Sequence, residues 1–451
     1  MASATTMGTA VATPQRSLAY IIGASSVGTL IEWYDFYLYG VLAAFFAGHF
    51  FPASMGGTQS FLYSLGIFWT GFVVRPFGAL FFGHLGDLVG RKFTFMLTLG
   101  LMGFSTFLVG CLPTYETIGW LAPALLVTCR IVQGLALGGE YGGAATYIAE
   151  HAPDGKRGFY TSWIQTTATI GIVTALLAIL AFRLGMGDAA FQSYGWRWPF
   201  LLSAVLVILS GYIRLQLQES PLYSRLKDQG KASENPALDT YKSGRNVGLM
   251  LLALFGATAP EGVVWYTGQF YALTYMLAVL KLPYVEVYLI LVIALLCGAP
   301  FFVVFGSLSD RIGRRPIMIA GFLLAVLTYI PVFNAFTTFK DNPTLLCLLV
   351  FYMVILVTMV YGPIAAFLVE IFPAKIRYSS MSMPYHIGNG VFGGGVPFIA
   401  TALAAAYPGV NRAGLDYPIG VAAIGVVVGL FGFRQTYLHR IWDEVGGEPA
   451  E

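Results

Sequence analysis

Long apolar runs, separated by short polar segments, fill most of the chain. Each run has about 20 residues or more, the length that an α-helix needs to cross the hydrocarbon core of a membrane. Lipid offers no partner to backbone N–H and C=O groups, so we expect each run to be a helix. The pattern predicts twelve membrane-spanning helices, six in each half, at 18–45, 60–84, 93–113, 118–149, 160–183, 197–216, 246–279, 284–308, 316–337, 343–369, 378–405 and 417–436.

Proline interrupts several of these runs. Because its ring removes a backbone N–H and clashes with the preceding turn, we expect helix kinks at the prolines within them. The positions concerned are Pro76, Pro260, Pro300, Pro363 and Pro397.

Two charged signatures occur once in each half of the chain. GHLGDLVGRK at 83–92 returns as GSLSDRIGRR at 306–315, and Glu150 followed by two basic residues returns at Glu370. Such duplication is typical of transporters built from repeats around a central site. The sequence therefore predicts an all-α membrane protein with two pseudo-symmetric six-helix bundles, at 18–216 and 246–436.

The basic residues predict the orientation. The long polar segment 217–245 is expected to link the bundles, and most of the 25 Lys and Arg residues fall on the same side of the predicted spans as this linker. Basic residues concentrate in cytoplasmic loops. We therefore predict a multi-pass protein of the cell inner (plasma) membrane, with cytoplasmic tails at 1–17 and 437–451.

The composition is typical of a membrane protein, and the residues argue against an enzyme. The residues are 57% hydrophobic and 10% charged, whereas soluble domains have about a quarter charged residues. Four cysteines show no metal-ligand spacing, and no phosphate loop or nucleophile–base set is evident. We predict that the protein is not an enzyme, binds no metal or nucleic acid, uses no cofactor other than the proton as coupling ion, and is a monomer.

The doubled G-x-x-x-D-x-x-G-R-[KR] signature with twelve spans resembles the major facilitator superfamily. Three further stretches resemble its metabolite:proton symporter branch, whose members carry α-ketoglutarate, citrate, shikimate, or proline and betaine. They are EWYDFYLYG at 32–40, RIVQG to GGEYGG at 130–143, and YGP to EIFP and Arg377 at 361–377. The resemblance implies the fold of that superfamily and alternating access. Leu88 departs from the family pattern, which has a basic residue there.

Ionisable residues within membrane spans are expensive to bury and are functional candidates. Glu32 and Asp35 are three residues apart and so on one helical face. Arg130 is expected at a similar depth, where protonation of Asp35 would break an ion pair between them and switch the conformation. A similar pair links helices in the resembling sugar porters. The alternative is a permanent ion pair that only ties helices together.

Two arginines are candidates for binding an anionic substrate. Arg75 is predicted at mid-depth, where it needs an anion, and its guanidinium suits a carboxylate. Arg197 is the second candidate, and both resemble arginines of dicarboxylate carriers. For Arg197 the alternative is anchoring among interfacial tryptophans. Polar residues that could face the same cavity, or only join helices, are Gln133, Tyr266, Gln269, Tyr385 and Asn389, while the roles of Glu261 and His386 stay open.

The loop signatures predict a cytoplasmic gate. Acidic residues at helix ends and basic residues just after them can latch this face while the other is open. The alternative is a topology signal from the basic residues alone, but such a signal needs no acid at fixed spacing. The predicted gate residues are Asp87, Arg91, Glu150, Arg157, Asp310, Arg311, Arg314, Glu370 and Arg377.

The predicted function is secondary active transport. We expect proton-coupled uptake of a small organic anion or zwitterion, most simply a mono-, di- or tricarboxylate or a betaine-like molecule. The alternatives are a proton-coupled antiporter or a facilitative uniporter of the same fold. From another class, a membrane sensor that binds a metabolite without moving it would fit the same spans.

Overall fold

The computed structural model describes residues 18–89, 91–139, 141–215, 229, 236–407, 412–441 and 443. Throughout these residues the regular secondary structure is helical, with no strand. The predicted all-α fold class is confirmed. The predicted tail 1–17, most of the linker 217–245 and the end of the tail 437–451 lie outside the described residues.

The first half of the chain forms eleven numbered α-helices and two short 3₁₀ turns. They are α1 (Leu18–Val41), α2 (Ala43–His49), η1 (Ala53–Met55), α3 (Gly57–Val73), α4 (Arg75–Val89), α5 (Arg91–Cys111), α6 (Tyr115–Ile118), α7 (Leu121–Gly138), α8 (Tyr141–His151), α9 (Arg157–Met186), α10 (Asp188–Ser193), η2 (Gly195–Arg197) and α11 (Trp198–Leu215).

The second half differs in that several of its helices contain π-helical segments, namely η3, η4, η5 and η7. Its elements are α13 (Pro236–Lys242), α14 (Gly244–Ala253), η3 (Leu254–Thr258), α15 (Ala259–Tyr266), η4 (Thr267–Tyr271), α16 (Ala272–Thr274), η5 (Tyr275–Val279), α17 (Tyr284–Gly298), α18 (Pro300–Ile312), α19 (Arg314–Thr338), α20 (Pro343–Tyr361), α21 (Ile364–Ile371), η6 (Ala374–Ile376), α22 (Arg377–Tyr385), η7 (His386–Gly393), α23 (Val396–Ala406) and α24 (Asp416–Gly432).

Each of the twelve predicted spans coincides with helix. Among the described residues, nine continuous helices are long and apolar enough to cross a membrane. The pair Ser25–Val41 and Ala43–His49, bent by 55°, makes a tenth if it is one span. Two shorter apolar helices, Met96–Cys111 and Asp416–Gly432, occupy the remaining predicted spans. Length and composition thus support nine or ten full spans, with the other two shorter than expected.

The prolines predicted to kink helices lie at the starts of helical segments. Pro76, Pro260 and Pro397 are each the second residue of a helical segment, and Pro300 is the first residue of α18. Pro363 directly precedes α21. Proline is tolerated in the first turn, where its missing N–H would have no helical partner. The spans that contain these prolines each continue as one helix, and the one bend above 40° found among the described residues lies between α1 and α2, so the kinks stay a prediction.

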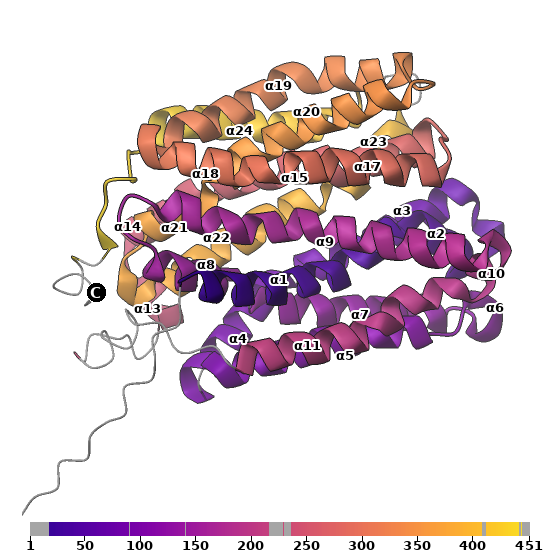
Figure 1. The fold of residues 1–451 in the computed structure, drawn as a ribbon, viewed down its shortest axis with the longest axis horizontal. Coiled ribbons are helices and arrows are strands. Elements are labelled where there is room, and N and C mark those ends of the chain that lie inside the picture. The colour runs from indigo at the N-terminus through magenta and orange to yellow at the C-terminus, as the bar shows by residue number, and fades with distance from the viewer. Residues whose placement is uncertain are drawn as a thin grey trace, which may run out of the picture.

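The two halves of the chain lie against each other along a tight seam. In Figure 1 the indigo and magenta helices of the first half occupy the lower part of the molecule, and the orange and yellow helices of the second half occupy the upper part. At the seam α9 packs along α17 and α18. A Cβ added to Gly158 would lie 2.2 Å from the Gly306 carbonyl oxygen. Only glycine permits this approach of two helix backbones.

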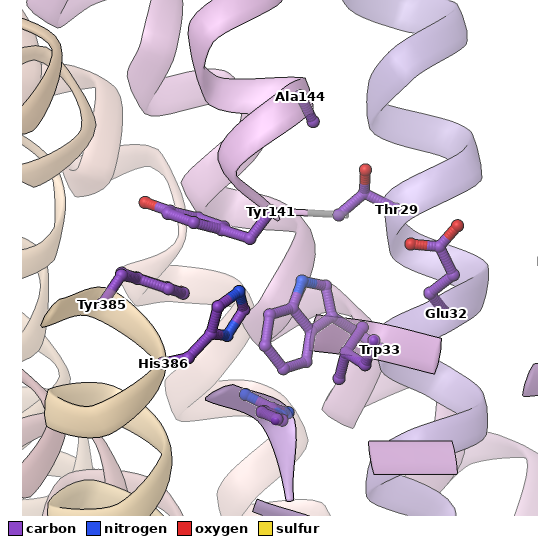
Figure 2. Close-up of a pocket in the computed structure, with 9 residues that line it drawn as sticks. Thr29, Glu32, Trp33, Tyr141, Ala144, Tyr385 and His386 are labelled. Carbon is purple, nitrogen blue, oxygen red and sulfur yellow. The ribbon is translucent and has the colours of Figure 1, made fainter. Parts of the chain in front are cut away.

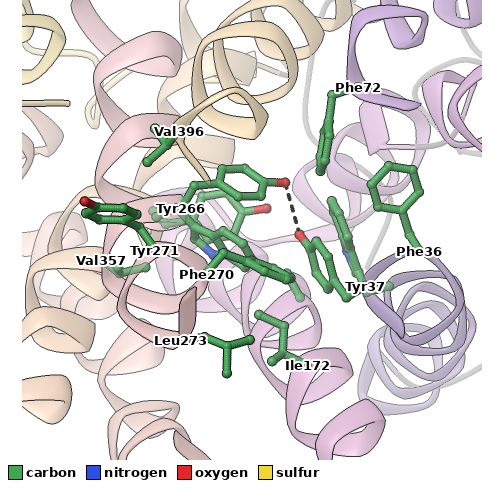
Figure 3. Packing of buried hydrophobic residues seen from close by; sticks show 14 of the residues in the cluster. Phe36, Tyr37, Phe72, Ile172, Tyr266, Phe270, Tyr271, Leu273, Val357 and Val396 are labelled. Atoms are coloured by element: carbon green, nitrogen blue, oxygen red, sulfur yellow. Dashed lines mark hydrogen bonds between the residues drawn. The ribbon is translucent and has the colours of Figure 1, made fainter. Parts of the chain in front are cut away.

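Aromatic side chains join the halves in the middle of the bundle (Figure 3). Tyr37 of α1 stacks on Trp265 of α15 with 5.2 Å between ring centroids, and its hydroxyl lies 3.5 Å from that of Tyr266. Phe68 of α3 lies 5.2 Å from Phe270 of η4. All five side chains are buried. This layer fills the interior between the two halves.

Candidate functional site

A small cavity lies between the two halves (Figure 2). Its volume of about 10 Å³ is close to the minimum for one water molecule, whereas small-molecule sites have about 300 Å³ or more. The cavity must therefore enlarge before it can hold a substrate. Its lining residues are Thr29, Glu32, Trp33, Arg75, Leu137, Tyr141, Ala144, Tyr385 and His386.

Arg75 is the cation of this cavity. Its side chain is 1% exposed, and its guanidinium lies 4.3 Å from the Phe72 ring centroid and 4.5 Å from that of Phe36. Among the described residues its Nε and Nη2 atoms have no hydrogen-bond partner. A buried guanidinium with unused N–H groups is poorly compensated, and a carboxylate would satisfy it with charge-assisted hydrogen bonds. The structure places Arg75 where the sequence predicted an anion-binding arginine.

Three tyrosines in contact with one another connect the two halves beside the cavity, and two of them, Tyr141 and Tyr385, line it. Tyr141 of α8 stacks on Tyr385 of α22 with ring centroids 3.5 Å apart, and the Tyr385 and Tyr361 hydroxyls are 2.8 Å apart. Gln165 donates to the Tyr141 hydroxyl at 2.7 Å. Tyr385 was predicted as a substrate residue. Tyr141 was missed, although it stands in the GGEYGG stretch that carries the family resemblance.

Glu32 and Asp35 of α1 occupy different surroundings. Glu32 lines the cavity, whereas Asp35 contacts α11 and accepts a hydrogen bond from Ser203 at 2.5 Å. Both side chains are 1% exposed. The Asp35 Oδ2 atom has no hydrogen-bond partner among the described residues. Only Glu32 of this predicted pair therefore reaches the cavity.

The predicted ion pair between Asp35 and Arg130 is not formed in this structure. Arg130 donates instead to Gln133 Oε1 at 2.7 Å and to the Phe36 carbonyl at 3.1 Å. Arg130 thus contacts the backbone of Phe36, the residue after Asp35, and not the Asp35 carboxylate. Successive side chains on a helix point about 100° apart, so a contact at one residue does not bring Arg130 to the side chain of the residue before it. Gln133 also donates to Thr106 at 2.9 Å. Arg130 and Gln133 of α7 thus tie this helix to α1 and α5, and both lie outside the cavity lining.

The remaining predicted substrate residues do not line the cavity. Tyr266 contacts Tyr37, and Gln269 is buried with no hydrogen-bond partner for its amide among the described residues. Asn389 donates to both carboxyl oxygens of Glu261, at 3.1 and 3.2 Å.

The substrate role predicted for Arg197 is not supported by its position. Arg197 is the last residue of η2, directly before α11, donates to the Leu112 carbonyl at 3.0 Å and packs on Trp196 with 4.2 Å to the ring centroid. It is absent from the cavity lining. The arrangement fits the alternative, an anchor among tryptophans, because the end of a span favours side chains with both apolar and polar parts.

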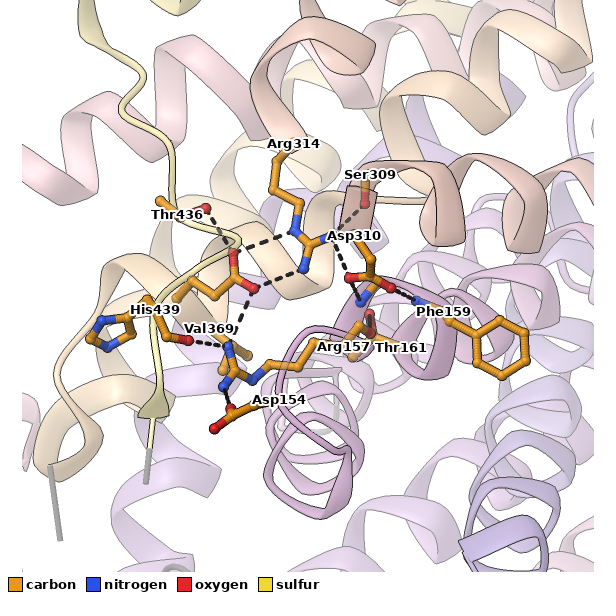
Figure 4. A network of polar contacts seen from close by, with 12 residues as sticks. Asp154, Arg157, Phe159, Thr161, Ser309, Asp310, Arg314, Val369, Thr436 and His439 are labelled. Atoms are coloured by element: carbon orange, nitrogen blue, oxygen red, sulfur yellow. Dashed lines mark hydrogen bonds and ion pairs between the residues drawn. The ribbon is translucent and has the colours of Figure 1, made fainter. Parts of the chain in front are cut away.

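A charged network joins the halves at one end of the bundle (Figure 4). Arg314 pairs with Glu370 at 2.9 Å and with Asp310 at 2.6 Å, and Arg157 approaches Glu370 to 3.5 Å. Arg157 also pairs with Asp154, which the sequence analysis did not single out. We call this end the latch end. Four of the predicted gate residues, Arg157, Asp310, Arg314 and Glu370, meet there.

Asp310 also holds the start of α9. Its two oxygens accept the backbone N–H groups of Gly158 and Phe159, each at 2.8 Å. These are unpaired N–H groups at a helix N-terminus, where the helix dipole favours an anion. An acid of the second half thus caps a helix of the first half, which closes the latch end directly.

A second ion pair accompanies the network. Arg377 lies 3.5 Å from Glu150 and donates to the carbonyls of Val369 and Phe372. Arg311 is exposed and takes no part in the network that the described residues form, so its gate role stays a prediction. Asp87, Leu88 and Arg91 have side chains outside the described ones.

Comparison with known proteins gives consistent results. The family model described as Major Facilitator Superfamily matches residues 25–396 and 266–442. The alpha-ketoglutarate permease of Escherichia coli (strain K12) is 34% identical over 424 residues, which cover 93% of this chain and 95% of that protein. The shikimate transporter of the same strain is 35% identical over 395 residues, covering 85% and 87%.

A further relative and a solved structure extend the comparison. The proline/betaine transporter of Escherichia coli (strain K12) is 33% identical over 420 residues, covering 91% of this chain and 82% of that protein. The structure of the proton:xylose symporter XylE bound to 6-bromo-6-deoxy-D-glucose has a TM-score of 0.73 at 20% identity, covering 92% of this chain and 94% of that one. At this identity the likeness concerns the fold.

Proposed function

The chain belongs to the Major Facilitator Superfamily and is a membrane transporter rather than an enzyme, and from this premise we propose that it carries a small carboxylate-bearing metabolite into the cell together with a proton. The relatives that support the proposal are named for α-ketoglutarate, shikimate, and proline or betaine. These compounds differ in size and net charge, but each has a carboxylate. The shared group is the one that a buried arginine would recognise.

The observation that carries the proposal is the unsatisfied guanidinium of Arg75. It is buried in the cavity between the halves and lacks hydrogen-bond partners for two of its nitrogens among the described residues. Two forked hydrogen bonds to a carboxylate would pair both charge and geometry. The neighbouring Trp33 and Tyr385 supply apolar and hydroxyl surface for the rest of the molecule.

The proposed transport cycle follows from the closed state. The latch end is held by ion pairs between the halves, and the cavity is too small for a metabolite. A carboxylate and a proton enter when the opposite end opens. Charge neutralisation in the cavity then permits the latch end to separate, because differential binding to the two conformations shifts their populations.

The experiment is uptake into proteoliposomes with an imposed pH gradient. α-Ketoglutarate, shikimate, proline and glycine betaine are offered as radiolabelled compounds, with an internal pH dye to record proton entry. We expect an acidic exterior to drive accumulation of at least one compound with acidification of the lumen. Transport unaffected by the gradient would instead indicate a uniporter, and acidification driven in the opposite sense would indicate an antiporter. No movement of any carboxylate would refute the proposal.

A further inference from the structure

Glu261 is a fully buried acid close to the cavity but outside its lining. Its side chain is 0% exposed, and the amide of Asn389 donates to both of its oxygens. No ion pair reaches it within the part of the chain that the structure describes. A carboxylate buried without a cation is strongly destabilised, whereas the protonated acid is neutral. The surroundings of Glu261 in this conformation therefore suit its protonated form.

The groups that face Glu261 from other elements are tyrosine hydroxyls. Those of Tyr141 in α8, Tyr361 in α20 and Tyr385 in α22 interact with it electrostatically, as does Tyr266 on its own stretch of helix. Toward α24, α15 presents Pro260 against Gly425, an apolar contact. Toward α19 it presents the Val264 carbonyl, which accepts from Tyr329. Neutral hydroxyls and apolar contacts thus surround the acid.

Arg75 approaches the same π-helical segment from the first half. Asn389, which holds Glu261, is followed by Gly390, and a Cβ added to Gly390 would lie 3.6 Å from Arg75 Cδ. Gly262, next to Glu261, packs on the same segment, since a Cβ added there would lie 2.7 Å from Asn389 Cα. Among the described residues, a guanidinium with two nitrogens that lack hydrogen-bond partners and a carboxyl without an ion-pair partner thus pack on one segment, η7. Single π-helical turns of this kind occur often at functional sites.

We propose that the proton of Glu261 and the carboxylate on Arg75 bind together. With Glu261 protonated, Arg75 is free to hold the substrate carboxylate. When Glu261 releases its proton to solvent, its carboxylate becomes the competing anion for Arg75 and the substrate leaves. The O–H bond of Glu261 is the one covalent bond that breaks in this step, and its proton goes to solvent. The inference rests on the proposed function and assigns to Glu261 the proton that is linked to substrate binding.

The test is the pH dependence of carboxylate binding by the purified full-length protein. The probe is α-ketoglutarate or shikimate, whichever the wild type binds, measured by calorimetry between pH 5 and 9. Linkage to one proton predicts that Kd rises about tenfold per pH unit above the range where Glu261 stays protonated. Glu261→Gln mimics the protonated acid, so its Kd should stay constant. Glu286→Gln, on a partly exposed position of α17, is the matched control. Its Kd should depend on pH as the wild-type Kd does.

Proton uptake on binding provides a second measurement that does not depend on a variant folding. In weakly buffered solution, at a pH where the wild-type Kd rises with pH, the wild type should take up about one proton per carboxylate bound. Binding without proton uptake would overturn the inference, as would an unchanged slope in Glu261→Gln. A slope that vanishes in Asp35→Asn but persists in Glu261→Gln would assign the proton to Asp35 instead. Failure of the wild type to bind any carboxylate would refute the proposed function itself.

Discussion

At the scale of single residues, two buried arginines show how partners separate structural from ligand-binding roles. Arg130 is 0% exposed and donates to Gln133, to the Phe36 carbonyl and to the Phe68 carbonyl. Arg75 is equally buried but lacks comparable partners among the described residues. A charge satisfied by fixed groups has little to gain from an anion, and one left unsatisfied has much. We therefore expect Arg75, rather than Arg130, to bind the carboxylate.

Replacing Arg75 tests this assignment. Hydrogen bonds to charged groups contribute about 1.5–3 kcal/mol, so Arg75→Ala should raise the apparent KM for a transported carboxylate by about 10- to 100-fold. Arg75→Lys should have a smaller effect, because it keeps the charge and loses the fork. The measurement is initial uptake rate against substrate concentration. Arg245→Ala, at an exposed position of α14, should leave KM unchanged, and an unaltered KM in Arg75→Ala would rule out this contact.

Asp35 should act on the conformational change rather than on binding, because it contacts Ser203 of α11 and does not line the cavity. Asp35→Asn fixes the neutral state of the side chain. We expect it to abolish accumulation driven by a pH gradient while leaving substrate counterflow, which needs no net proton movement. Ser203→Ala should impair accumulation less. Wild-type accumulation in Asp35→Asn would remove Asp35 from coupling.

The sequence could identify these residues but not their partners. Arg75, Asp35 and Glu32 were found because ionisable side chains in apolar runs are rare and need a reason. Whether Arg130 meets Asp35 or the backbone of Phe36 depends on the rotation of one helix against another. Periodicity within a single helix does not contain that rotation. The same limit explains why Glu261 stayed undecided until Asn389 was placed beside it.

At the scale of helices, the latch end depends on one acid that caps a helix of the other half. Asp310 accepts two N–H groups at the start of α9 and also pairs with Arg314. The doubled signature predicted that Asp310 takes part in a latch. It did not predict the helix N-terminus as partner, because the motif shows charged side chains and the partner is backbone.

Removing the charges of the latch should open this end. Asp310→Asn and Glu370→Gln each remove one anion from the buried arginines of the network, and breaking a buried pair is strongly destabilising to the contact. In a background without native cysteines, Ser162→Cys lies at the seam beside Gly306 and reports opening by maleimide labelling. We expect labelling to become on the order of tenfold faster or more in either variant.

Arg311→Gln is the control for this measurement, because Arg311 is exposed and outside the network. Its labelling rate should equal that of the parent. If Asp310→Asn and Glu370→Gln also label at the parental rate, the charges at this end do not hold the halves together, and the topology signal from the basic residues would be their remaining role.

At the scale of the whole molecule, the structure is closed at both ends. Opposite the latch end, the Tyr284 hydroxyl of α17 donates to Asp188 of α10 at 3.1 Å, and the Arg183 guanidinium lies 3.1 Å from the centroid of the Tyr284 ring. Nearby, Tyr288 donates to the Val41 carbonyl at 3.2 Å. Between these contacts and the latch end lie the aromatic layer and the small central cavity of about 10 Å³ (Figure 2). This is the arrangement that alternating access requires between its two open states.

The contacts opposite the latch end should govern opening on that side without sensing pH. The hydrogen bond donated by Arg183 lowers the pKa of Asp188, so Asp188 stays ionised and its contacts persist from pH 8 until the pH falls below the ordinary carboxyl range. Tyr284→Phe removes only the hydroxyl contact, and Tyr284→Ala also removes the ring under Arg183. We therefore expect little opening in the first variant and clear opening in the second, measured as the distance between spin labels on α10 and α17.

Asp341→Asn, exposed in the loop before α20, is the control and should leave that distance unchanged. A distance that grows between pH 8 and pH 5 in the wild type would show that closure at this end does respond to protons, and equal distances in Tyr284→Ala and wild type would show that Tyr284 does not hold it.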